Sequence, residues 1–421
     1  MNRRIVLGAA AVLVLAAGYF AFGELSDIVK TWYADNYMPR TSPTVATEQP
    51  SQVCLTVGAD PRTTIAVQWR TSPAVSDGAV QFREKSAPES AATEVAAKQS
   101  ALSDPMITND PVNHRYDAEM GGLKPATTYA YRVGSKQKNV WSAWIEFTTA
   151  PEGTVPFTFG YVGDPQLGLE FWGKLMHTCF DKYPQAAFYV VAGDIVNRGK
   201  YRDEWDTLFL ASEGIFDRRP MIPLLGNHDY SSLPTPDIYL KTFRLPENGP
   251  KGFFPERAYS FRYSNALFVI LDANLEPKDQ VVWLEEQLKN TDATWKFVCY
   301  HQPSYSSSPN RDNPEIRKVW GEVFDKYHVD IALQGHDHAY LRTFPMKGEK
   351  KAASFADGTV YIVSVSGTKY YDQADLDYTE VGFTKISTYQ IIDIETTPKN
   401  KLTYRAYDID GNVKDEFVIE K

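Results

Sequence analysis

The chain has 421 residues, more than one ordinary hydrophobic core accommodates, so its length predicts two to three domains. Hydrophobic residues make up 43% and charged residues 23% of the chain, which is typical of a globular protein and excludes a disordered one. The 44 basic and 53 acidic residues give a formal net charge of -9, which disfavours binding to nucleic acid.

The first 23 residues have the pattern of an export signal. Arg3 and Arg4 precede an uncharged apolar run, Ile5–Gly23, in which no polar residues line one face as they would in a core helix. Ala21-Phe22-Gly23 offers a small-x-small cleavage site, and the run is also long enough to span a bilayer. We expect a signal peptide or a membrane anchor with the arginines in the cytoplasm. Either would place the rest of the chain outside the cytoplasm, as a periplasmic, extracellular or membrane-anchored protein.

Residues 24–52 are interpreted as a linker, because the stretch from Asp35 to Gln52 is polar and rich in Thr, Ser and Pro. The three cysteines lie in apolar stretches of different predicted elements, which favours buried free thiols over disulfides. They are Cys54, Cys179 and Cys299.

Residues 53–150 have the alternating pattern of a small all-β sandwich. The stretch Leu123–Tyr131 resembles the tyrosine corner of a fibronectin type III-like domain, with Trp69 as a core residue. A short Pro-containing link, Ala150–Pro156, marks the predicted boundary with the second half.

The second half repeats one pattern: an apolar run leads directly into Asp, Asn or His, in most cases through a glycine. The five runs are Phe157–Val162, Ala187–Ala192, Met221–Leu225, Trp295–Tyr300 and Val329–Leu333. Stretches with helical spacing lie between them: Phe171–Tyr183, Trp205–Phe216, Val281–Leu288 and Ile316–Tyr327. This alternation predicts an α/β fold, in which ligands bind at the carboxyl ends of the strands. An isolated Asp or Asn at such a place is usually a turn residue, so the prediction rests on the recurrence.

The residues at these five exits resemble, in order and spacing, the motif blocks of the calcineurin-like metallophosphoesterases. The blocks are Gly163-Asp164-Pro165-Gln166, Gly193-Asp194, Gly226-Asn227-His228-Asp229, His301 and Gly335-His336-Asp337-His338. The resemblance covers roughly residues 156–421 and implies a four-layer αββα sandwich. A fibronectin-like domain in front of it also resembles the arrangement in purple acid phosphatases.

This resemblance implies a site for two metal ions, for which carboxylate, imidazole and amide groups are suitable ligands. Asp194 would bridge the ions, and Asp164 and His338 would complete the first site. Asn227, His301 and His336 would complete the second. Gln166 stands where many relatives have a ligand histidine, so it would be a weak ligand or only a neighbour of the ligands.

Purple acid phosphatases carry a tyrosine in the block Gly-Asp-x-x-Tyr, which supplies a tyrosinate to ferric iron. Here the block reads Gly193-Asp194-Ile195-Val196-Asn197. The purple colour is therefore not expected, and the two ions are left open as divalent or mixed-valence iron, manganese or zinc.

The mechanism that the family implies is attack on phosphorus by a hydroxide that bridges the metals, since the ions lower the pKa of bound water towards about 7. His228, not a ligand by the motif, would protonate the leaving group, and Asp229 would orient its imidazole. We expect an exported enzyme that acts on phosphate monoesters of small molecules or phosphoproteins. Phosphodiesters or nucleotides are the alternative substrates, and a cell-surface binding module with a non-catalytic metal domain is the alternative function. The sequence does not indicate an oligomeric state.

After the last block, four stretches are predicted to be antiparallel strands that complete the second sheet: Gly358–Val365, Tyr389–Ile394, Lys401–Ile409 and Val413–Ile419. The insertion Tyr370–Phe383 is rich in Tyr and Asp. We expect it to overhang the site and, through its acidity, to disfavour highly charged substrates. Four residues lie on loops beside the blocks and could contact phosphate, but we interpret them as solvated loop residues: Arg198, Tyr230, Tyr305 and Arg311.

Overall fold

The computed structural model describes residues 37–230, 235–253, 255–374 and 376–421. The predicted export segment, residues 1–23, and the first part of the predicted linker lie outside the described residues. Within the described ranges, no helix has the length and apolar character needed to cross a membrane.

The N-terminal part is built from strands. They are β1 (Ser51–Val57), β2 (Ile65–Thr71), β3 (Ala79–Glu84), β4 (Thr93–Ala96), β5 (Lys98–Ser103), β6 (Val112–Met120), β7 (Thr128–Ser135), β8 (Val140–Trp141) and β9 (Ile145–Thr148). Strands β1, β2, β6 and β5 pair in that order, and strands β4, β3, β7, β8 and β9 form a second sheet. The core between these sheets contains Trp69, which is fully buried and stacks on Tyr116. The Tyr129 hydroxyl accepts a hydrogen bond from the Lys124 N–H at 2.9 Å, as in a tyrosine corner.

The second part alternates strands and helices before it ends in strands. Its first elements are β10 (Phe157–Val162), α3 (Leu169–Lys182), β11 (Ala186–Val191), α4 (Arg202–Ala211), β12 (Met221–Pro223), α5 (Asp237–Thr242), β13 (Tyr259–Tyr263), β14 (Ala266–Ile270), α6 (Lys278–Lys289), β15 (Trp295–Cys299), α7 (Pro314–Tyr327) and β16 (Ile331–Gln334). The remaining ones are β17 (Tyr340–Thr343), β18 (Met346–Lys347), β19 (Lys350–Lys351), β20 (Val360–Val363), β21 (Thr379–Phe383), β22 (Tyr389–Glu395), β23 (Lys401–Tyr407) and β24 (Val413–Glu420). Each of the five predicted apolar runs overlaps a strand, and each of the four predicted helical stretches overlaps a helix.

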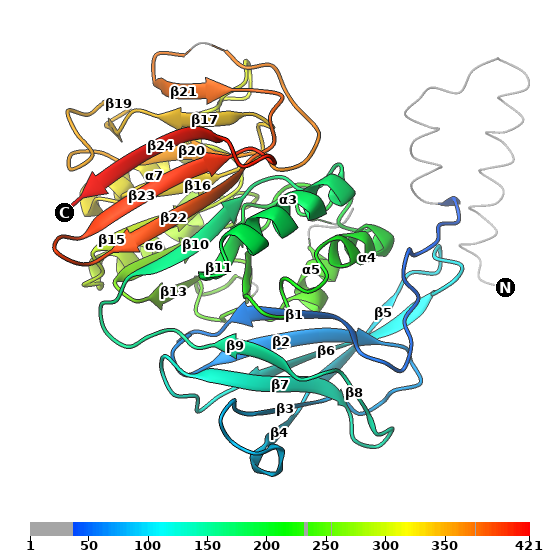
Figure 1. Ribbon diagram of the computed structural model, residues 1–421. Coiled ribbons are helices and arrows are strands. Elements are labelled where there is room, and N and C mark those ends of the chain that lie inside the picture. The colour runs from blue at the N-terminus through cyan, green and yellow to red at the C-terminus, as the bar shows by residue number, and fades with distance from the viewer. Residues whose placement is uncertain (1–36, 231–234, 254, 375) are drawn as a thin grey trace, which may run out of the picture.

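These elements form two sheets packed face to face between two helical layers, so the predicted αββα sandwich is confirmed (Figure 1). Phe159 of β10 packs edge-to-face on Phe268 of β14 and Phe297 of β15 in the other sheet. Helices α3 and α4 bury Trp172 and Trp205 against the first sheet. Helices α6 and α7 pack on the outer face of the second sheet.

The prediction for the C-terminal strands was wrong in two respects. Strand β22 pairs antiparallel with β10, so β22, β23 and β24 extend the first sheet rather than complete the second. Of the four predicted strands only β20 lies in the second sheet, where it runs parallel to β16 on one side and antiparallel to β17 on the other. Alternation of apolar residues predicts that a segment is a strand, but it does not indicate which sheet the strand joins or which strand it pairs with.

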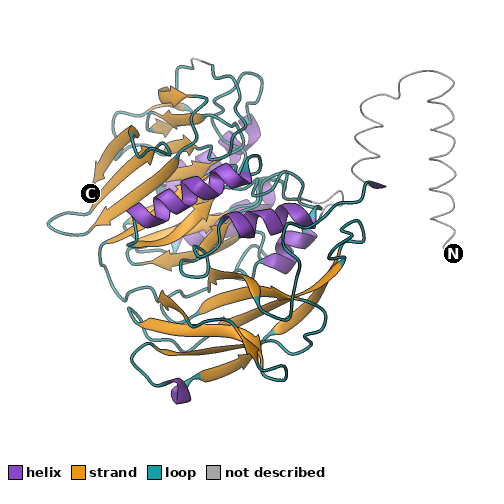
Figure 2. Cartoon of the chain, turned by 45° about the vertical axis from the view of Figure 1, so that its right-hand side comes forward, coloured by secondary structure: helices purple, strands orange, loops and turns teal. Residues whose placement is uncertain are grey.

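The first sheet continues from the second part into the N-terminal part. Strand β1 pairs parallel with β12 through Thr56 and Met221, and the Leu55 N–H donates to the Phe216 carbonyl at 2.7 Å. The result is a ten-stranded sheet in the order β24-β23-β22-β10-β11-β12-β1-β2-β6-β5. Figure 2 shows the strands of both parts on either side of this junction.

The interpretation of residues 24–52 as a linker was wrong for its last residues. Arg40 pairs with Asp104 at 2.8 Å and also with Asp203 of α4. The Ser42 hydroxyl donates to Asp206 of α4 at 2.7 Å, and strand β1 already begins at Ser51. The polar side chains that suggested a solvated stalk thus have partners in both parts of the chain.

The cysteines are free and buried, as predicted. Burial raises the pKa of Cys54, Cys179 and Cys299 well above that of an ordinary thiol, so they are inert components of the core.

Candidate metal centre

The carboxyl ends of five strands bring the predicted ligands together. Strands β10, β11 and β12 pair parallel in one sheet, and β15 and β16 pair parallel in the other. Two groups of ligand atoms result, and within each group all ligand atoms lie within 4.8 Å of one another. One group is Asp194, His301 and His336, and the other is Asp164, Asp194 and His338. Asp194 belongs to both groups, which is the position that a bridging ligand requires.

Four of these residues have left-handed backbone conformations. The φ angles are 48° at Asp164, 47° at Asp194, 78° at His336 and 47° at His338. Such angles are uncommon outside glycine and concentrate at functional sites, where surrounding contacts compensate for the strain. Here they make the backbone turn sharply after the strand that precedes each ligand.

The glycines of the motif blocks permit the close approach of these turns. A Cβ atom on Gly226 would lie 2.2 Å from Asp194 Oδ1, and one on Gly193 would lie 2.7 Å from His301 Nδ1. Any larger residue at either position would collide with a predicted ligand.

Hydrogen bonds orient the ligand side chains. The His336 N–H donates to the two Asp164 oxygens at 2.9 and 2.7 Å, and the His228 N–H donates to Asp194 Oδ1 at 2.8 Å. His301 Nδ1 lies 2.7 Å from the Ala192 carbonyl, so Nδ1 carries the proton. The Nε2 atom of His301 is thereby left to face Asp194 Oδ2 at 3.2 Å.

The electrostatics of the cluster favour bound cations. Burial raises the pKa of Asp164 well above its usual range, and despite burial the carboxylates of Asp194 and Asp164 raise the pKa of His301 to about 10. Burial, together with His301 and Arg311, lowers the pKa of His336 to about 2. Burial and Lys369 lower the pKa of His338 to about 3. The raised pKa of His301 shows that the buried carboxylates favour a positive charge beside them, which bound cations would supply. The imidazoles of His336 and His338 are neutral, the form that binds a metal ion.

The residues fit two cations. His336 Nδ1 lies 3.2 Å from His301 Nε2. These two ring nitrogens are close enough to bind the same ion. Buried Gln166 Oε1 has no hydrogen-bond partner among the residues that the structure describes. The cluster combines imidazole nitrogens with carboxylate oxygens and no thiolate, which suits zinc, manganese or iron.

The remaining two predicted ligands occupy different positions. Gln166 is buried, and its Nε2 atom lies 2.8 Å from His338 Nε2, within reach of the group formed by Asp164, Asp194 and His338. Asn227 is exposed, and no hydrogen bond fixes its side chain within the described ranges. Its neighbours Gly226 and His228 both contact Asp194, so the backbone at Asn227 borders the cluster. Its role as a ligand stays a prediction.

The predicted role of Asp229 was wrong. The Asp229 carboxylate does not contact the His228 ring. It accepts backbone N–H groups from Ile195 at 2.8 Å, Val196 at 3.2 Å and Gly226 at 2.8 Å. The ring of His228 is instead held by the Asn197 carbonyl, 2.6 Å from Nδ1. Asp229 thus joins the two turns that follow β11 and β12, and it does so as a buried residue.

Three of the four neighbouring residues that we interpreted as solvated have partners in the structure. Arg311 Nε donates to Asp337 Oδ1 at 3.0 Å. The Tyr230 hydroxyl bonds to the Asp272 carboxylate. Tyr305 is buried, with ring centroids 4.8 Å from Tyr361 and 5.0 Å from Tyr378. Arg198, which pairs with Glu204, is exposed as predicted.

Sequence reasoning assigned no role to Asp337, which lies between the two histidines of the last block. It is fully buried and accepts hydrogen bonds from Ser306, Ser307 and Arg311. Its place between two predicted ligands was the one available signal. Asp337 ties the loop after β15 to the ligand pair.

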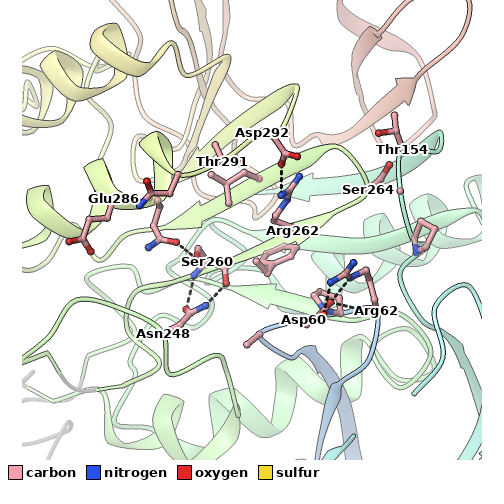
Figure 3. Close-up of a pocket in the computed structure, with 18 residues that line it drawn as sticks. Asp60, Arg62, Thr154, Asn248, Ser260, Arg262, Ser264, Glu286, Thr291 and Asp292 are labelled. Atoms are coloured by element: carbon pink, nitrogen blue, oxygen red, sulfur yellow. Dashed lines mark hydrogen bonds and ion pairs between the residues drawn. The ribbon is translucent and has the colours of Figure 1, made fainter. Parts of the chain in front are cut away.

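A cavity of about 650 Å³ lies away from this cluster (Figure 3). Its lining includes the turn at Asp60–Arg62, Thr154 of the interdomain link, and Arg262 of β13, and it includes none of the predicted ligands. Arg62 pairs with Asp60, and Arg262 pairs with Asp292, as the dashed lines in Figure 3 show. Thr291 and Asp292 precede β15, so this cavity borders the amino end of a strand whose carboxyl end meets the cluster.

Fold and cluster together define an αββα protein in which a cluster of side chains that fits two cations lies at the carboxyl ends of the strands. Comparison of the sequence with models of known protein families identifies the family of each part. Residues 50–149 match the purple acid phosphatase N-terminal domain, and residues 157–340 match the calcineurin-like phosphoesterase domain. The chain therefore belongs to the calcineurin-like metallophosphoesterase superfamily and carries the N-terminal domain of the purple acid phosphatases.

Individual relatives agree with this assignment. The probable purple acid phosphatase 20 of Arabidopsis thaliana is 28% identical over 242 residues, 54% of this chain and 55% of that protein. The Fe(3+)-Zn(2+) purple acid phosphatase 12 of the same plant is 26% identical over 70% of this chain and 65% of its own length. The chain thus spans less than two thirds of these relatives.

Solved structures support the fold. The purple acid phosphatase PPD1 from yellow lupin (Lupinus luteus) has a TM-score of 0.75 at 18% identity, over 88% of this chain and 74% of its own. The structure of PhoD has a TM-score of 0.61 at 14% identity, over 90% and 93% of the two chains.

Proposed function

We propose that this protein is a dinuclear metal-dependent phosphohydrolase that cleaves phosphate monoesters. The observation that carries the proposal is the position of Asp194 in both groups of ligand atoms. Family membership supports hydrolysis of phosphate esters, and the relatives named above support monoesters. The integrity of the cluster disfavours the alternative of a binding module with a non-catalytic metal domain.

Five clustered side chains would hold the ions, together with Asn227. Bound there, the two ions would neutralise phosphoryl charge and generate a hydroxide nucleophile near neutral pH. The chain's own contribution is to fix the ligands in advance. Three backbone N–H groups on Asp229 and the His336 N–H on Asp164 lock the turns before any ion binds.

His228 is the proposed general acid. The Asn197 carbonyl accepts a hydrogen bond from the Nδ1–H group, which orients the ring and leaves Nε2 to deliver a proton to the leaving oxygen. The His228 backbone N–H at the same time binds Asp194 Oδ1. One residue would thereby couple the bridging carboxylate to protonation of the leaving group.

For the metals we propose divalent or mixed-valence iron, manganese or zinc without the purple colour. The relative named as an Fe(3+)-Zn(2+) enzyme suggests iron and zinc. Asn197 replaces the tyrosine that would colour ferric iron, so this chain does not need a ferric ion for that contact. We also propose export, which rests on the sequence of residues 1–23, and phosphorylated small molecules or phosphoproteins as substrates.

The proposal is tested by stripping the purified protein of metal and reloading it separately with manganese, zinc and iron. Hydrolysis of a chromogenic phosphate monoester is compared with that of the matching diester, and Asp194→Asn is the control. Metal-dependent monoester turnover that is lost in the control supports the proposal. A preference for the diester would reassign the substrate, and no turnover of either ester would overturn the proposed activity.

A further inference from the structure

Three side chains outside the predicted ligand set lie beside the ligand histidines: Arg311, Lys369 and Tyr371. The Tyr371 ring packs on the His338 ring with a centroid distance of 4.8 Å. The Arg311 guanidinium carbon lies 4.8 Å, and Lys369 Nζ lies 4.9 Å, from the centroid of the Tyr371 ring. The Tyr371 ring therefore contacts two positively charged side chains, Arg311 and Lys369, next to the proposed metal site.

The loop after β20 that carries Lys369 and Tyr371 is fixed to two ligand turns. The Gly367 N–H donates to the Asp164 carbonyl at 3.0 Å, and the Thr368 N–H donates to the Leu167 carbonyl at 2.8 Å. The Tyr371 N–H donates to the His338 carbonyl at 3.1 Å. Lys369 thus lies between two anchored residues, so its position relative to the cluster is set by the backbone.

Arg311 is fixed from the other side of the cluster. Its Nε atom donates to Asp337 at 3.0 Å, and its Nη2 atom donates to the carbonyl of the ligand His336 at 3.2 Å. No hydrogen bond occupies Nη1 in the part of the chain that the structure describes, and the side chain is 30% exposed. The guanidinium is held in place and keeps donor capacity towards solvent or a ligand.

Lys369 is half-buried and forms no ion pair with any residue that the structure describes. Positive side chains beside a site for two cations are unfavourable unless an anion is shared between them. A tetrahedral oxyanion bound at the metals is such a partner, since guanidinium and ammonium groups both bind phosphoryl oxygens.

We propose that Arg311 and Lys369, spaced by Tyr371, form a clamp for the phosphoryl oxygens of the substrate and of the phosphate product. This inference rests on the proposed function and adds residues to the site that the motif blocks do not contain. Neither cation belongs to the insertion Tyr370–Phe383, whose residue beside the ligands is Tyr371.

The test uses the metal-loaded full chain and inorganic phosphate as the probe, with affinity measured by titration calorimetry. Lys369→Gln should weaken phosphate binding about tenfold, the effect of losing one charge-assisted contact. Lys369→Arg should restore binding to within about threefold, because it keeps the charge. The matched control is Lys182→Gln: Lys182 Nζ also lies 4.9 Å from a tyrosine ring, that of Tyr407, but on α3. The control should bind phosphate as the wild type does.

Kinetics supply a second readout. Lys369→Gln should raise the KM for a chromogenic monoester and the inhibition constant of phosphate together, with a smaller change in kcat. Arg311→Gln should do the same, provided that its melting temperature shows a folded protein. Unchanged phosphate affinity in a folded Lys369→Gln protein overturns the clamp, whatever the turnover. Weakened phosphate binding in a protein that hydrolyses no ester would support the clamp and overturn the proposed function instead.

Discussion

His301 Nε2 lies 3.2 Å from Asp194 Oδ2, although the two residues follow strands of different sheets. Asp194 follows β11 of the ten-stranded sheet, and His301 follows β15 of the seven-stranded sheet. The cluster is therefore formed only when the sheets are packed together, and its geometry depends on the core between them.

The first prediction concerns the junction of the turns at Asp229. Asp229→Ala should lower the free energy of unfolding by about 3 kcal/mol, because three buried N–H groups lose their acceptor. Denaturant titration of the metal-free protein measures this change.

The matched control for Asp229 is Asp292→Ala. Asp292 forms an exposed ion pair with Arg262, and such pairs contribute about 0.5 kcal/mol or less. Equal effects of the two substitutions would contradict the assigned role of Asp229.

The second prediction concerns His228. His228→Ala should retain both metal ions and lose turnover by about 10²- to 10⁴-fold for esters with poor leaving groups, which need a proton. Esters with good leaving groups should lose much less. The measurement is kcat across a series of aryl phosphates of increasing leaving-group pKa. A uniform loss across the series would count against the acid role.

The third prediction is a pH dependence of stability that comes from Glu256. Burial raises the pKa of Glu256 from its usual value of 4.5 to about 7. The unfolded chain therefore loses this proton before the folded protein does, and the contribution of Glu256 to stability falls as pH rises from about 4.5 to about 7.

Glu256→Gln removes this titration and keeps an oxygen for the Leu245 N–H that Glu256 Oε1 accepts at 2.9 Å. The metal-free variant should melt above the wild type at pH 8 and together with it at pH 4. Thermal melts at the two pH values make the comparison. A variant that melts below the wild type at pH 8 would show that this titration does not limit stability.

The fourth prediction concerns the ion pairs that join the two parts of the chain. Asp206 of α4 contacts Arg70 of β2 at 2.7 Å, and both side chains are almost fully buried. Asp206→Ala should cost about 3 to 5 kcal/mol, because it leaves a buried guanidinium without its partner. Denaturant titration measures the loss. A change below 1 kcal/mol would indicate that water or another carboxylate, such as Asp110 at 3.9 Å, replaces it.

The layered fold and most of the cluster were predictable because each ligand follows an apolar run. A run such as Phe157–Val162 predicts a buried strand, and parallel strands present their carboxyl ends on one edge. The pairing of β22 with β10 was not predictable, because it joins segments more than 200 residues apart by backbone hydrogen bonds.

The partners of the site residues were less accessible to sequence reasoning. Asp229 follows His228 in the chain, yet its carboxylate points to the turn at Ile195. The group that holds the His228 ring is a backbone carbonyl, which any residue at position 197 would supply. Lys369 and Arg311 come from loops without a motif and approach each other only through the Tyr371 ring.

The central claim is that Asp194 joins two metal sites. Its most direct test is the metal content per chain, measured by mass spectrometry after reloading and exhaustive dialysis. The account predicts two ions in the wild type, one in His338→Ala and fewer than one in Asp194→Ala, with all three proteins folded. One ion in the wild type, or two ions retained in Asp194→Ala, would contradict it.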